Sequence, residues 1–268
     1  TVRAHTGPAF LTYRDQPAVN RIIDAIEQQP PLFDFTTDTK VHHTVWRAPD
    51  APALVQAFSH VPCVYIADGH HRTAAAARAA RALGFDPERP NELDEFAWFP
   101  AVIFPASQLN ILAYNRCVAD LNGLSSSNFL EAVKARFDVT DDAQPVPPIA
   151  RRAAMYLGGR WYGLSWPALA TDDPATALDV SVIQNRILQP LLGIDDPRTS
   201  DRIEFVGGIK GTEDLERRVN DGRAAVAFSL HPVSVEQMMA IADTGGIMPP
   251  KSTWFEPKLC SGLLTHTF

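Results

Sequence analysis

The chain has 268 residues, of which 46% are hydrophobic and 21% are charged, and its formal net charge is −7. This composition can build a sizeable core, so general disorder is excluded, and the acidic balance disfavours broad binding to nucleic acid. No stretch approaches the ~20 apolar residues of a membrane-spanning helix. We therefore expect no DNA partner and no membrane partner.

The three cysteines, Cys63, Cys117 and Cys260, are odd in number and widely spaced. This pattern favours reduced thiols over a disulfide framework or a zinc site. The first residues do not resemble a signal peptide, so we expect a cytoplasmic protein. We identify no metal-ligating residues in the sequence. Because the first residue is Thr1 and not Met, we also expect the chain to be trimmed or processed.

Hydrophobic spacing predicts the elements in chain order. In the first part we expect a helix over 17–28, a hairpin from 33–35 and 41–46 with Asp38 and Thr39 near its turn, a helix over 51–59, a strand–turn–helix over 64–83, a loop over 85–95, and strands over 96–105 and 109–118. In the second part we expect a helix over 125–137, a hairpin from 153–157 and 160–164, a helix over 172–192, a strand over 202–206, a helix over 212–221 capped by Thr212, a strand over 224–230, a helix over 234–243 and a last strand after Gly262.

These elements predict an α+β fold, with a mixed β-sheet and flanking helices around residues 64–83 and a C-terminal α/β half. We divide the chain into residues 1–120 and 121–268, and a single domain is the alternative. The polar, proline-rich residues 141–148 are the best candidate for a linker.

The stretch Val64–Ala77 carries the strongest functional signal, because polar residues gather where a strand passes into a helix. The first turn of a helix offers free N–H groups to an anion, and Arg72 adds a planar fork of donors. Asp68 could accept a hydroxyl proton, and Gly69 permits close approach of a ligand. The alternative is a plain helix start with solvent-exposed side chains. A metal site at His70 and His71 is weaker still, because adjacent residues rarely chelate one ion.

A second polar motif lies near the C-terminus, where Lys251, Ser252 and Thr253 follow two prolines. It lacks the glycine spacing of a Walker A loop. A cation and two hydroxyls on a rigid turn still suit phosphate, and a basic surface turn is the alternative.

Two resemblances rest on these motifs. Residues 66–72, 248–258 and 261–263 together resemble the domain-of-unknown-function 1015 family. Members usually carry a further N-terminal segment, which implies that this chain is a fragment. The Asp-Gly-His-His-Arg stretch is also similar to the motif of free serine kinases with a ParB/sulfiredoxin-like fold.

The second resemblance implies a ParB/sulfiredoxin-like core around residues 64–83 and a nucleotide-dependent phosphotransferase acting on a small hydroxy amino acid such as serine. It implies Asp68 as the base, phosphate on the His and Arg side of the motif, ATP or ADP as cofactor, and Mg²⁺. The alternative function is a non-catalytic nucleotide- or phosphate-binding regulatory module. The sequence identifies neither a second catalytic carboxylate nor an oligomeric state. We predict Asp68 and His70 as catalytic residues, and as phosphate- or nucleotide-binding residues Gly69, His71, Arg72, Thr73, Lys251, Ser252 and Thr253.

Overall fold

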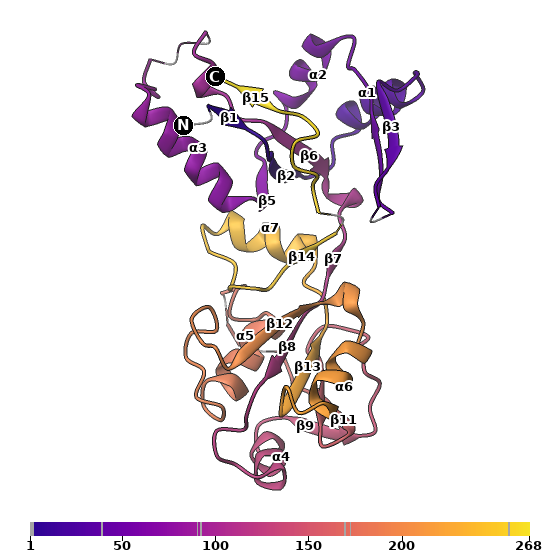
Figure 1. Cartoon of the computed structure of the whole chain (residues 1–268), viewed down its shortest axis with the longest axis vertical. Coiled ribbons are helices and arrows are strands. Elements are labelled where there is room, and N and C mark those ends of the chain that lie inside the picture. The colour runs from indigo at the N-terminus through magenta and orange to yellow at the C-terminus, as the bar shows by residue number, and fades with distance from the viewer. Residues whose placement is uncertain are drawn as a thin grey trace. The chain divides into compact units, whose positions relative to one another are not determined.

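The computed structural model describes residues 3–38, 40–89, 91, 93–168, 170–171, 173–256 and 258–268. The chain forms two compact units (Figure 1). Unit 1 comprises Thr1–Leu109 and Pro257–Phe268, and unit 2 comprises Asn110–Glu256. The expected boundary after residue 120 and the expected linker at 141–148 therefore both fall inside unit 2.

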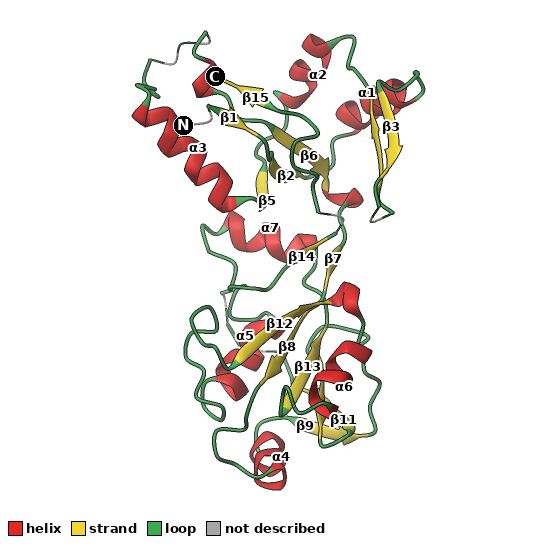
Figure 2. Ribbon diagram, in the orientation of Figure 1, coloured by secondary structure: helices red, strands yellow, loops and turns green. Residues whose placement is uncertain are grey.

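Unit 1 is built on a three-stranded mixed sheet in the order β5-β2-β6 (Figure 2). The central strand β2 (Ala9–Tyr13) pairs antiparallel with β5 (Tyr65–Asp68) and parallel with β6 (Ala101–Pro105). Four of the five β2 residues are buried, as expected for a strand with neighbours on both sides. The predicted mixed sheet is confirmed.

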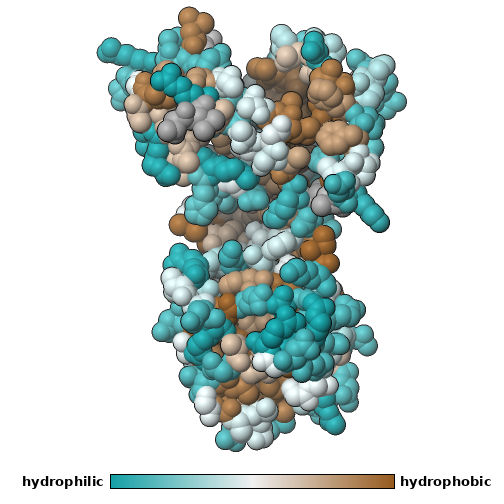
Figure 3. Space-filling model, viewed as in Figure 1, coloured by the Kyte–Doolittle hydropathy of each residue, from teal (hydrophilic) through white to brown (hydrophobic). Residues whose placement is uncertain are grey.

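Two small antiparallel pairs and three α-helices also lie in the described part of unit 1. The pairs are β1 (Ala4–His5) with β15 (His266–Thr267) and the hairpin β3 (Phe33–Thr36) with β4 (His42–Val45). The helices are α1 (Pro17–Glu27), α2 (Ala51–Phe58) and α3 (His70–Ala82). Proline at the first turn of α1 and α2 favours helix initiation there. Apolar side chains also remain exposed in this unit, and Figure 3 shows brown surface near α1 and α2.

Unit 2 contains a six-stranded antiparallel sheet in the order β12-β8-β13-β10-β11-β9. Its strands are β8 (Tyr114–Val118), β9 (Asp138–Asp141), β10 (Arg152–Leu157), β11 (Arg160–Ser165), β12 (Ile203–Gly207) and β13 (Val226–Leu230). A separate pair joins β7 (Ile111–Leu112) to β14 (Trp254–Phe255). All five residues of β13 are buried, because it lies inside the sheet.

The helices of unit 2 are α4 (Ser126–Lys134), α5 (Asp179–Ile183), α6 (Glu213–Asn220) and α7 (Val235–Asp243). Two separate groups of buried apolar residues cover the sheet. The larger contains Phe129 of α4 and Ile183 of α5, and the smaller contains Leu215 of α6. The predicted α+β class, with an α/β half toward the C-terminus, is thus confirmed.

Three predicted elements need correction. The helix expected over 172–192 begins only at Asp179, because the Asp173 carboxylate accepts the N–H groups of Ala175 and Thr176 and holds a turn. It continues as a π-helix over Gln184–Leu188, and Asp172 lies outside the described residues.

The strand expected over 96–105 begins at Ala101, after a 3₁₀ turn over Glu95–Ala97. The strand expected over 109–118 is interrupted at Ala113, so that β7 and β8 belong to different sheets. Thr212 occupies the cap of α6 without a side-chain capping bond. Thr39, expected near the hairpin turn, lies outside the described residues.

The helices within the described ranges are each too short or too polar to cross a membrane. Cys63, Cys117 and Cys260 are free cysteines in this structure.

Candidate functional site

The predicted strand–turn–helix at Asp68 is present in unit 1. Strand β5 ends at Asp68, and Gly69 turns the chain with φ of 90° before α3 begins at His70. A residue with a β carbon rarely adopts this left-handed conformation. Glycine therefore allows the polar residues that follow to enter the helix immediately.

The Asp68 carboxylate is fixed from two directions. Its Oδ1 accepts a hydrogen bond of 2.7 Å from the backbone N–H of Gly69. Its Oδ2 lies 3.7 Å from Nζ of Lys258, which belongs to the C-terminal part of the same unit. The Asp68 side chain is still 43% exposed, so Oδ2 can be reached by a small molecule.

The Arg72 side chain folds back over the turn. A β carbon built on Gly69 would lie 3.0 Å from Nη2 of Arg72, and one built on Gly7 would lie 3.2 Å from Cδ of Arg72. The two glycines thus leave the space that the Arg72 side chain occupies. No described residue makes a hydrogen bond or an ion pair with the Arg72 guanidinium, although it has five N–H donors.

The C-terminal segment completes this cluster. The N–H of Gly262 donates a hydrogen bond of 2.7 Å to the carbonyl oxygen of Thr6. Oγ of Ser261 would lie 3.5 Å from a β carbon on Gly7, beside the Arg72 side chain. Residues near both ends of the chain and residues of the Asp68 turn therefore meet in unit 1.

The start of α3 offers further donors. The first helical hydrogen bond runs from the N–H of Thr73 to the carbonyl of Gly69, and no side chain caps the helix. The N–H groups of His70, His71 and Arg72 consequently have no acceptor among the described residues. Both histidine side chains are exposed, whereas the Thr73 hydroxyl donates to the Gly69 carbonyl at 3.1 Å.

The second predicted motif lies in unit 2. Lys251 adopts φ of 55°, and its Nζ lies 5.9 Å from the centre of the Tyr114 ring. Ser252 is buried, and its hydroxyl donates to the Pro249 carbonyl at 2.7 Å. Thr253 is half-buried. The Ser252 hydroxyl therefore stabilises the turn, and the phosphate role of Lys251, Ser252 and Thr253 stays a prediction.

Chain-order reasoning missed Gly7, Lys258, Ser261 and Gly262 as members of the cluster around Asp68. Lys258, Ser261 and Gly262 stand in the C-terminal motifs that carry the family resemblance, so that signal was present. Only the fold shows that they meet the Asp68 turn. No group of three or more His, Cys, Asp or Glu side chains within the described ranges is arranged to hold a metal ion.

Taken together, the fold and the cluster define an α+β protein whose first unit places a guanidinium and a carboxylate at the start of one helix. The guanidinium of Arg72 has no ion pair within the described part of the chain, and the carboxylate of Asp68 accepts a backbone hydrogen bond. The chain belongs to the DUF1015 family, described as a protein of unknown function, whose model matches residues 1–181. No curated protein matches the chain.

Several solved structures are similar to the chain. SbnI with a C-terminal truncation from Staphylococcus aureus is 12% identical, with a TM-score of 0.44 over 97% of this chain and 86% of that one. A conserved hypothetical protein from Pyrococcus furiosus is 16% identical, with a TM-score of 0.39 over 94% of this chain and 90% of that one. A mutant free serine kinase in complex with ADP is 14% identical, with a TM-score of 0.40 over 92% of this chain and 84% of that one.

Proposed function

We propose that unit 1 binds the phosphate groups of a nucleotide at the Asp68 turn and transfers a phosphoryl group to a small hydroxy amino acid such as serine. The observation that carries this proposal is the Arg72 guanidinium, which lies over Gly69 without an ion pair or hydrogen bond among the described residues. Phosphoryl transfer depends mainly on positioning and charge neutralisation, and an Arg fork beside free helix N–H groups supplies both.

Five side chains of the cluster have a role in this proposal. Arg72 and the N–H groups at the start of α3 hold phosphate oxygens. Asp68 accepts the proton of the substrate hydroxyl at Oδ2, because its Oδ1 is already engaged by Gly69. The hydroxyl oxygen bonds to the terminal phosphorus as the bond from that phosphorus to the bridging oxygen breaks. His70 is the second predicted catalytic side chain, and His71 and Lys258 donate further hydrogen bonds to phosphate.

Mg²⁺ fits this site only when a bound nucleotide supplies additional oxygen ligands. Mg²⁺ is usually held in nucleotide sites by one or two carboxylates together with phosphate oxygens and water. Asp68 is the carboxylate of the cluster that could join such a set, and it also contacts Lys258. We therefore expect metal binding to depend on bound nucleotide.

A thermal-shift titration tests the binding step. ATP, ADP, CTP and inorganic phosphate are each added with and without Mg²⁺ to wild type, Arg72→Ala and Arg78→Ala. Arg78 is a matched control, because it is an exposed arginine of the same helix. A ligand at ~100 times its Kd adds about 2.7 kcal/mol of stability. We expect a nucleotide shift that Arg72→Ala removes and Arg78→Ala retains, and equal shifts in all three proteins would refute the proposed phosphate site.

A non-catalytic nucleotide-binding module is the second candidate. The contacts of Asp68 favour this second candidate. Its carboxylate contacts Gly69 and Lys258, and no second carboxylate among the described residues contacts it. Asp68→Asn separates the two functions, because an amide oxygen can still accept the Gly69 N–H while losing the negative charge. Loss of serine phosphorylation with retained nucleotide binding supports the kinase. Binding without turnover in wild type supports the module.

A further inference from the structure

A pocket of about 240 Å³ lies within unit 2, and none of its lining residues has a role in the proposed function. Its walls come from β8, from residues 175–185, and from Pro249 and Pro250 of the second sequence motif. The pocket has room for a compact metabolite.

Arg116 lines this pocket although it is only 3% exposed. Its Nη1 donates to the Tyr114 carbonyl, and its Nη2 donates to the Lys251 carbonyl at 3.0 Å. Its Cζ lies 5.5 Å from the centre of the Phe205 ring. These contacts engage two of the five N–H donors of a guanidinium, so donors remain for a ligand.

No carboxylate among the described residues pairs with Arg116. A buried charge without an opposite charge is costly, and buried cations are usually paired. Burial lowers the pKa of Arg116 to about 9, partly offset by Tyr114, so the side chain is still a cation at neutral pH. An anion bound in the pocket would supply the opposite charge that Arg116 lacks.

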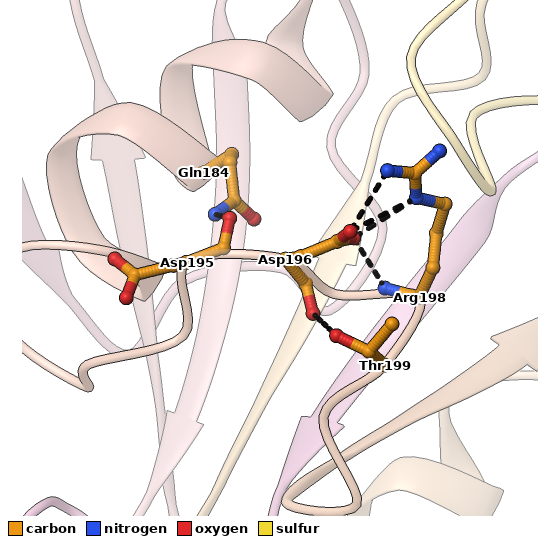
Figure 4. A network of polar contacts seen from close by, with 5 residues as sticks. All are labelled: Gln184, Asp195, Asp196, Arg198 and Thr199. Atoms are coloured by element: carbon orange, nitrogen blue, oxygen red, sulfur yellow. Dashed lines mark hydrogen bonds and ion pairs between the residues drawn. The ribbon is translucent and has the colours of Figure 1, made fainter.

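The other polar groups around the pocket are mostly engaged elsewhere. Gln184 donates to the Ile194 carbonyl at 2.7 Å, and Ser181 donates to the Ala175 carbonyl at 2.6 Å. Figure 4 shows that Asp196, which precedes the pocket-lining Pro197, directs its carboxylate to Arg198. Asp196 is therefore already neutralised by another partner.

Asn185 is the exception. It lines the pocket, it is exposed, and its amide has no hydrogen bond among the described residues. Arg116 and Asn185 both line the pocket, and both side chains can donate hydrogen bonds to an oxyanion.

We propose that this pocket of unit 2 binds the oxyanion group, carboxylate or phosphate, of a compact metabolite, with Arg116 as its anchor and Asn185 as a second donor. The proposal does not depend on the function proposed for the Asp68 turn. It also gives the Pro-Pro-Lys motif a role, since Pro249 and Pro250 form a wall and Lys251 holds Arg116 through its carbonyl.

The test is calorimetric titration of inorganic phosphate and of acetate into the full chain at constant ionic strength. All proteins carry Arg72→Ala, which removes the arginine of the phosphate site proposed at the Asp68 turn. In that background we compare Asn185→Asp with Asn128→Asp. Both change an exposed asparagine of unit 2 to a carboxylate, but Asn128 lies in α4, which contributes nothing to the pocket walls.

We expect the Arg72→Ala protein to bind one of the two anions, Asn185→Asp to weaken that binding by about tenfold or more, and Asn128→Asp to leave it unchanged. Preference for acetate or for phosphate identifies the ligand group. Absence of binding of either anion overturns the proposal, as does binding that Asn185→Asp does not weaken. Arg116→Lys, checked for folding by circular dichroism, should weaken the same binding because it keeps the charge but loses the fork.

Discussion

The guanidinium of Arg72 lies so close to Gly69 that a β carbon on Gly69 would be 3.0 Å from Nη2. Glycine at this position therefore has two functions. It permits φ of 90° at the start of α3, and it leaves space for a guanidinium that has no ion pair among the described residues. A substitution here should affect both the stability of the turn and the position of Arg72.

We predict that Gly69→Ala lowers the free energy of unfolding by about 1–2 kcal/mol and also weakens nucleotide or phosphate binding. Gly84→Ala is the matched control. Gly84 follows the same helix with φ of 102°, but a β carbon there would contact nothing within 4 Å. Urea unfolding and ligand titration of both variants separate backbone strain from displacement of Arg72. Equal binding by the two variants would show that the close approach of Gly69 and Arg72 does not affect ligand binding.

Gly207 is a second position where a neighbouring side chain leaves no space for a β carbon. A β carbon on Gly207 would lie 2.6 Å from Cε2 of Trp254, whose indole also packs against Tyr114. We expect Gly207→Ala to reduce the stability of unit 2 by about 1–3 kcal/mol, because overpacking forces the ring to move. Combining it with Trp254→Leu should recover part of the loss in a double-mutant cycle. Strictly additive effects would argue against this contact.

The pH dependence of unit 2 should report on Asp179. Burial raises the pKa of this carboxyl to about 6, although the Arg151 N–H and the charges of His231 and Arg151 act in the opposite direction. Well below pH 3.8 the carboxyl is protonated in both the folded and the unfolded chain. As the pH rises toward 6 only the unfolded chain releases the proton, so stability falls through this window.

The difference between about 6 and the ordinary 3.8 corresponds to at most about 3 kcal/mol. Unfolding of wild type and Asp179→Asn, measured from pH 4 to 7, tests this expectation. The variant should lose less stability than wild type between pH 4 and 6. Parallel profiles for the two proteins would mean that Asp179 does not titrate in this range.

Thiol labelling should distinguish the three cysteines. Cys63 is exposed and Cys260 is half-buried, whereas burial raises the pKa of Cys117 to about 12. A thiol reagent attacks the thiolate, so we expect two cysteines to react in the native protein and the third only after unfolding. Cys63→Ser and Cys260→Ser should each remove one of the two fast-reacting thiols. Rapid labelling of Cys117 would contradict the burial of β8.

Local sequence determined much of the secondary structure because the relevant physics is local. Ser125 caps α4, Ser234 forms a capping box with Gln237 at α7, and Gly158 and Gly159 close the β10–β11 hairpin. The Asp68 turn was equally clear, because glycine and polar residues stand directly between an apolar strand and an alanine-rich helix. Each of these features depends on residues that are neighbours in the chain.

The tertiary structure decided everything that joins distant segments. Lys258 and Ser261 reach the Asp68 turn only because the C-terminal residues return to unit 1. Arg116 lines a pocket only because β8 is buried beside the Lys251 carbonyl. Periodicity and capping describe the environment of one segment. Which segments become neighbours is fixed by how the sheets bury their apolar faces, and that depends on the whole chain.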